Sequence, residues 1–264
     1  MMDNPVPIPL WAMVAFYALL LLPAGLIWYF RLGVLRRLAI AVVRMTVQLT
    51  LVGVLLIYWF RWDNAWLNVL WVVVMVGFAA VSAVQSSTLR LRYFFVPVFL
   101  ALLVSGLSVL LFFNVLLLPI REVFSAQYLI IIGGMLLGNA LKGIVIGLSD
   151  FYQRLQDQQD AYRYYLAAGA SRWEALIPFF RNSLQAALNP SIASMATMGV
   201  VFLPGMMTGQ IIGGATPDTA IRYQLAIMIV IFVCIALSVV LGVSFSLGRS
   251  FDGYGNLRAG VFRK

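Results

Sequence analysis

The sequence predicts an all-α polytopic membrane protein with about seven transmembrane helices. Hydrophobic residues make up 63% of the chain and charged residues only 10%, whereas roughly a quarter of the residues in a soluble domain are charged. The apolar residues form long uninterrupted runs, and a helix needs roughly 20 of them to cross a bilayer. Because a transmembrane barrel is built from short segments of alternating hydrophobicity, these continuous runs exclude it.

The apolar runs give the predicted helices directly. They cover residues 8–30, 38–60, 65–89, 93–120, 124–149, 183–217 and 223–247. Arg44 interrupts the second run and Lys142 the fifth. Only Asp3 carries a charge before the first run, so the basic region of a secretory signal is missing and we expect this helix to be retained.

The basic residues predict the orientation. Lys and Arg concentrate in cytoplasmic connections, and fourteen of the 18 follow the first, third, fifth and seventh runs, counting Arg44 at the edge of the second. Only Arg61, Arg121 and Arg222 follow the others. We therefore predict an extracytoplasmic N-terminus and a cytoplasmic C-terminus. This distribution also explains the net charge of +9 without nucleic-acid binding, since no soluble stretch carries a basic run.

The longest polar connection, residues 150–182, is predicted to lie in the cytoplasm. Its pattern predicts an amphipathic helix over 151–168, a turn at Gly169, and a second, short helix that carries Trp173 and returns to the membrane near Pro178. Ser171 and Glu174 have the spacing of a capping box, which marks the start of that second helix. Interfacial helices are common in large cytoplasmic loops, so this geometry alone does not assign a function.

The residues of this loop resemble the coupling loop of ABC-transporter permeases, with an acidic-Ala start at Asp160, a central Gly169 and a downstream Pro178. The resemblance implies that the loop inserts into a groove of a cytoplasmic ATPase subunit. The residues that would make this contact are Ala168, Gly169, Ala170, Ser171, Trp173 and Glu174.

A denser resemblance begins after this loop. The stretch from 189 to 228 contains LPGMMTG at 203–209 and AIRYQ at 220–224, and it is similar to the FetB family of ABC-transporter permeases. RMTVQLTLVG at 44–53 and Gly138-Asn139-Ala140 resemble the same family. The resemblance implies a single permease domain over 1–264 in the bacterial inner membrane, a second copy of the chain, a separate ATPase subunit that holds ATP and Mg, and iron export. Plant relatives are tied to aluminium tolerance and nucleotide-sugar transport, so the substrate carries over poorly.

The residue types agree with a permease driven by a partner. The chain has no GxxxxGK segment followed by Ser or Thr that would cradle ATP, so we expect no enzyme activity and no cofactor in this chain. The predicted spans contain no Asp, Glu or His, which disfavours a gradient-driven carrier and an intramembrane hydrolase. Two alternatives remain: a non-transporting membrane scaffold or sensor, and an ABC importer permease.

Several polar, small or sulfur-containing residues in the spans are candidates for the pathway or gate: Arg44, Gln48, Asn139, Met198, Pro204, Gly205, Met206 and Met207. Gly205, Gly209 and Gly213 are spaced for close helix packing, which is compatible with a dimer interface or a moving gate. The methionines either pack or offer thioethers to a soft ion, and no certain metal site is predicted. Arg44 and Lys142 either snorkel to the headgroups or face the pathway.

Overall fold

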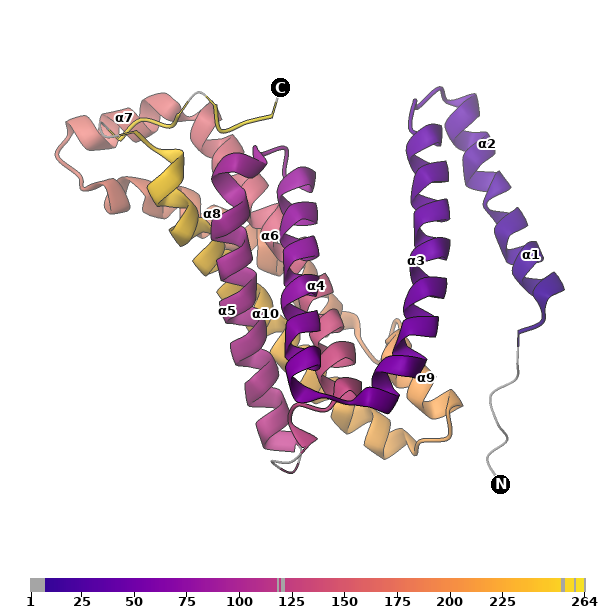
Figure 1. Cartoon of the computed structure of the whole chain (residues 1–264). Coiled ribbons are helices and arrows are strands. Elements are labelled where there is room, and N and C mark those ends of the chain that lie inside the picture. The colour runs from indigo at the N-terminus through magenta and orange to yellow at the C-terminus, as the bar shows by residue number, and fades with distance from the viewer. Residues whose placement is uncertain (1–7, 118, 120–121, 253–254, 259, 264) are drawn as a thin grey trace. The chain divides into compact units, whose positions relative to one another are not determined.

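The structure is a computed structural model that describes residues 8–117, 119, 122–252, 255–258 and 260–263. The regular elements in this part of the chain are helices (Figure 1). Six stretches are long and apolar enough to cross a membrane: Leu10–Tyr29, Leu35–Trp62, Ala65–Ser86, Leu91–Leu117, Ala126–Asp157 and Pro217–Ser250. The all-α polytopic fold is thus confirmed for the described residues, while the orientation stays a prediction.

The contacts divide the chain into two compact units. The first contains residues 1–62 and 209–216, including α1 (Leu10–Leu19), α2 (Leu21–Tyr29) and α3 (Leu35–Trp62). None of these three helices has a buried residue. A hydrogen bond of 2.7 Å between Tyr17 Oη and Thr46 Oγ1 joins α1 to α3. The apolar side chains of this unit are therefore left for lipid or another protein to cover.

The second unit contains residues 63–208 and 217–264. Its bundle consists of α4 (Ala65–Ser86), α5 (Leu91–Leu117), α6 (Ala126–Asp157), α8 (Arg172–Thr197) and α10 (Pro217–Ser250) (Figure 1). The short α7 (Gln159–Ala167) connects α6 to α8. Helices α4, α5, α6 and α10 bury one face each against their neighbours, so this unit holds the hydrophobic core.

Small residues allow α6 and α10 to approach closely. A Cβ added at Gly143 would lie 2.5 Å from Ile235 Cγ2, and one added at Gly147 would lie 2.6 Å from Val239 Cγ1. Both distances are shorter than van der Waals contact, so only glycine fits these two positions without a shift of α10. This face of the bundle is closely packed.

The prediction of a single span over 183–217 is wrong. Helix α8 begins at Arg172 and ends at Thr197, and the short α9 (Gly205–Ile212) follows after a turn. Met198 is extended and Gly199 has a φ of +85°, a left-handed conformation that ends the helix. Pro204 then disfavours helical geometry at the preceding residue, so the apolar run does not form one helix.

The predicted helix over 151–168 is also wrong in its bounds. Residues up to Asp157 continue α6, and α7 covers only Gln159–Ala167. The break at Gln158 redirects the chain so that Tyr162 is buried. The helix after the glycine turn is not short, because Pro178 and Pro190 are accommodated inside the 26 residues of α8.

Candidate functional site

A cavity of about 460 Å³ lies within the second unit, bounded by α6, α8, α10 and the turn that leads into α9. We call it the α6–α8–α10 cavity. Its lining is Met135, Asn139, Lys142, Ser191, Ser194, Met198, Phe202, Pro204, Gly205, Met206, Gln224, Ile227, Met228 and Ile231. Pockets of roughly 300–1,000 Å³ are the size that holds small-molecule ligands.

The cavity brings together several candidates that are far apart in the sequence. Five of the predicted pathway residues line it: Asn139, Met198, Pro204, Gly205 and Met206. Met207 follows on α9 and does not line it. Arg44 and Gln48 are exposed, one turn apart on α3 in the other compact unit. Their suggested roles stay predictions.

The polar groups of the lining are sparse. Asn139 Nδ2 donates to Met135 O at 2.9 Å, within its own helix. Gln224 is only 6% exposed, and its Oε1 is buried without a hydrogen-bond partner among the described residues. Its Nε2 lies 4.0 Å from Met198 Sδ. Lys142 is the one charged residue of the lining that the structure describes.

The sequence indicated only part of this lining. Gln224 lies inside the stretch that resembles FetB permeases, but the sequence predicted no role for it. For Lys142 the sequence left two interpretations open: snorkelling to the headgroups or facing the pathway. Each is a polar residue within an apolar helix, which is the signal that could have singled out both. Ser191 and Ser194 gave no comparable signal, because serine is common in membrane helices.

Within the single chain, the glycines of α9 have no close neighbour on another helix. Within its own compact unit, a Cβ added at Gly205 would meet no described atom within 4 Å, and the same holds for Gly209. The nearest atom to a Cβ at Gly213 is Gly209 O, 3.1 Å away in the same segment. Within this chain, close helix packing occurs at Gly143 and Gly147, and packing of the α9 glycines against a second copy stays a prediction.

The turn between α7 and α8 has the predicted local geometry. Gly169 has a φ of +93°, a conformation that L side chains rarely adopt. Ser171 Oγ accepts from Glu174 N at 3.3 Å, and Ser171 N donates to Glu174 Oε2 at 2.8 Å, which confirms the capping box. Hydrogen bonds from the Ser171 side chain and backbone lower the pKa of Glu174.

This turn is anchored to the end of α10. Arg172 Nη2 donates to Leu247 O at 3.0 Å, and the Arg172 guanidinium lies 4.2 Å from the centroid of the Phe251 ring. Tyr162 Oη donates to Gly255 O at 2.9 Å, and burial raises the pKa of Tyr162. The sequence gave no sign of these contacts, because they join segments about 75 or more residues apart.

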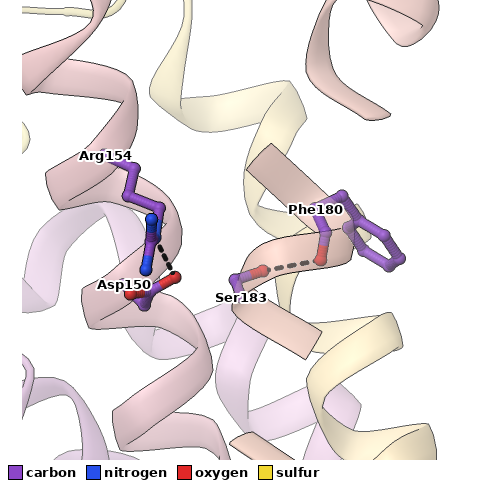
Figure 2. A network of polar contacts seen from close by, with 4 residues as sticks. All are labelled: Asp150, Arg154, Phe180 and Ser183. Atoms are coloured by element: carbon purple, nitrogen blue, oxygen red, sulfur yellow. Dashed lines mark hydrogen bonds and ion pairs between the residues drawn. The ribbon is translucent and has the colours of Figure 1, made fainter. Parts of the chain in front are cut away.

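Below the turn, α8 lies beside α6 (Figure 2). Asp150 Oδ2 accepts from Arg154 Nε at 2.7 Å on α6, and Ser183 Oγ donates to Phe180 O at 2.9 Å on α8. Asp150 therefore already has a cationic partner. Over the described ranges there is no group of three His, Cys, Asp or Glu residues that could hold a metal ion.

The fold and the cavity define a multi-pass α-helical membrane protein. The profile of the Uncharacterised protein family (UPF0014) matches residues 10–251, and the chain belongs to this family. It is 33% identical over 201 residues to "Probable iron export permease protein FetB" of Escherichia coli, covering 75% of each chain.

Two further relatives extend this comparison. "UPF0014 membrane protein slr1647" of Synechocystis is 31% identical over 75% of this chain and 76% of its own. "UPF0014 membrane protein STAR2" of rice is 29% identical over 94% of this chain and 86% of its own. No solved structure matches the chain.

Proposed function

We propose that this chain is the membrane-spanning permease subunit of an ABC transporter, and that two copies work with two separate ATPase subunits to export iron or another metal-linked solute across the inner membrane. The similarity to a relative named as an iron export permease supports the class of protein. The loop around Gly169 supports the ATPase partner, since its turn and capping box present an ordered, exposed element.

The observation that carries the proposal is the course of α8. Its first turn contains Arg172 and Trp173 beside the glycine turn, and its last turns contribute Ser191 and Ser194 to the cavity. At 1.5 Å per residue, Arg172 and Ser191 are about 28 Å apart along one helix. A displacement of the loop by a closing ATPase would therefore reach the cavity wall directly.

The anchor on α10 supplies a second connection. Arg172 holds Leu247 O and the Phe251 ring at one end of α10, and Gln224 lines the cavity nearer its other end. A loop that moves α8 would thus also act on α10. Packed helices of this kind shift as rigid elements and do not deform continuously.

Gentle detergent extraction of the full chain from its native membrane, followed by affinity purification, tests this proposal. We expect an ATP-binding-cassette subunit to copurify with the wild-type chain and with Arg163→Gln, which changes an exposed residue of α7. Gly169→Val should lose the partner. If no ATPase copurifies with the wild-type chain, the proposal is wrong, and a different copurifying signalling protein would support a scaffold or sensor.

The direction of transport needs a separate measurement. In inside-out vesicles that contain the permease with its ATPase, ATP should drive accumulation of iron in the lumen, which corresponds to export from the cell. Uptake seen only in right-side-out vesicles supplied with a solute-binding protein would instead identify an importer.

A further inference from the structure

Lys142 and Gln224 face the same cavity and have no assigned role. We infer that they form a binding site for the negatively charged oxygens and hydroxyl groups of the cargo, which therefore enters as a multi-atom hydroxylated anion, either free or as a metal chelate, and not as a bare cation. This inference rests on the proposed transport function, because it names the class of cargo for that cavity.

The first support is charge. Lys142 is near the middle of α6, between Ala126 and Asp157, and lines the cavity. Its ammonium has no ion-pair partner among the residues that the structure describes. Asp150, two turns further along α6, is paired with Arg154 (Figure 2). An unpaired lysine in a membrane helix is costly, also where it is exposed, as Lys142 is, and a bound anion would offset part of this cost.

The second support is the amide of Gln224. This side chain is 94% buried, lines the cavity and leaves Oε1 without a partner in the described chain. A buried acceptor left unsatisfied is destabilising. Oε1 itself has almost no accessible surface, so the amide must turn toward the cavity before a hydroxyl group of the cargo can donate to it. Gln224 would then select for a donor on the same molecule whose negative charge meets Lys142.

The third support is size and the nature of the walls. A cavity of about 460 Å³ holds on the order of ten or more water molecules, which is far more than a single dehydrated ion occupies. Phe202 and the four methionines Met135, Met198, Met206 and Met228 form most of the apolar wall. They would pack against the carbon skeleton of an organic anion, whereas the lysine would repel a soft cation such as Ag⁺ that the thioethers could otherwise bind.

Equilibrium binding to the purified full-length chain in nanodiscs tests the inference without the ATPase. The probes are citrate, gluconate and ferric citrate, compared with Fe²⁺ and Ag⁺ added alone. We expect the anions to bind the wild-type chain and Lys142→Gln to weaken them at least about tenfold, the effect of losing one hydrogen bond to a charged group. Lys142→Arg should retain binding. This result would show that the lost positive charge, and not misfolding, weakens anion binding in Lys142→Gln.

Two controls make the result specific. Arg92→Gln removes the same charge from an exposed position of the second unit outside the cavity, and should leave binding unchanged. Gln224→Met conserves volume and should weaken the hydroxylated anions while acetate, which has no hydroxyl group, is unaffected. Tighter binding of ferric citrate than of citrate identifies a chelate as the cargo class, and equal binding identifies the free anion.

The inference is overturned if no anion binds at millimolar concentration, if Lys142→Gln leaves anion affinity unchanged, or if Fe²⁺ or Ag⁺ alone binds more tightly than the anions. Because the assay contains no ATPase, these outcomes are separate from the copurification result. Lys142-dependent anion binding without a copurifying ATPase would refute the proposed transporter and keep the binding site.

Discussion

Two glycines of α6 and one at the start of α9 differ in what surrounds them. Gly143 and Gly147 on α6 lie so close to Ile235 and Val239 of α10 that no Cβ fits. Gly205, at the start of α9, has open space where its Cβ would be. The same residue type thus marks a close approach of two helices, α6 and α10, and an unpacked segment at α9.

From this difference we predict which of the helices around the cavity move. The α6 and α10 wall is held by interlocked side chains, and separating it would expose buried apolar surface. The α8 side ends in a turn at Met198 and Gly199, and residues Val200 and Val201 of that turn are highly exposed. We therefore expect α8 and its turn to move while α6 and α10 keep their mutual packing.

The largest expected effect comes from filling the packed wall. Gly143→Val should destabilise the second unit by about 1–3 kcal/mol or more, because the added atoms overlap Ile235 and cannot be accommodated without moving α10. Thermal unfolding in detergent measures the loss. Gly138→Val is the matched control, since a Cβ there has open space, and equal destabilisation by both variants would contradict the comparison.

At the loop we expect a smaller effect on stability but a selective effect on transport. Gly169→Val should abolish ATP-driven transport with little loss of folded protein, because a β-branched residue disfavours the φ of +93°. Gly169→Asn should retain much of the activity, since asparagine tolerates left-handed geometry better. Full transport by Gly169→Val would remove the turn from the mechanism.

Loss of the anchor on α10 should slow transport without abolishing it. Arg172→Leu removes the hydrogen bond to Leu247 O and the contact with Phe251, which are together worth about 1–3 kcal/mol. We expect slower transport per ATP hydrolysed, with unchanged ligand binding in the cavity. Arg163→Leu changes an exposed arginine of α7. It should alter neither the transport per ATP hydrolysed nor ligand binding.

The smallest effect is a pH dependence of the capping box. Hydrogen bonds from Ser171 lower the pKa of Glu174 below its ordinary value. The capping stabilisation is therefore complete above that ordinary value and is lost as the pH falls through the lowered pKa. Infrared titration of the carboxyl band, with Glu174→Gln as the subtraction control, should show Glu174 protonating at a higher pH in Ser171→Ala. An identical titration in both proteins would show that Ser171 does not stabilise the carboxylate.

Hydrophobic length predicted most of the fold, because a bilayer sets the length of a helix irrespective of its neighbours. Six of the seven predicted runs correspond to helices that could span a membrane. The failure at 183–217 has a local cause: hydropathy does not register that Gly199 and Pro204 end a helix inside an apolar run.

The candidate site was predictable only in part. Pro204 and Gly205 were found because they punctuate one apolar segment, Met198 and Met206 because their thioethers suit a soft ion, and Asn139 because it is polar within a span. Their meeting in one cavity depends on tertiary packing, which no local pattern encodes. The contacts of Arg172 with α10 were missed for the same reason.

The most direct test of the account is a distance measured across the second unit during the ATP cycle. Spin labels at Ile192→Cys on α8 and Phe78→Cys on α4 occupy exposed positions, with the buried Cys234 replaced by alanine. In the complex with its ATPase, trapping ATP should change the distance between these labels, whereas the Gly169→Val chain, which should lose the ATPase, should show no change when ATP and the ATPase are added. An unchanged distance in the ATP-trapped wild-type complex would contradict the claim that α8 carries the motion of the loop to the cavity.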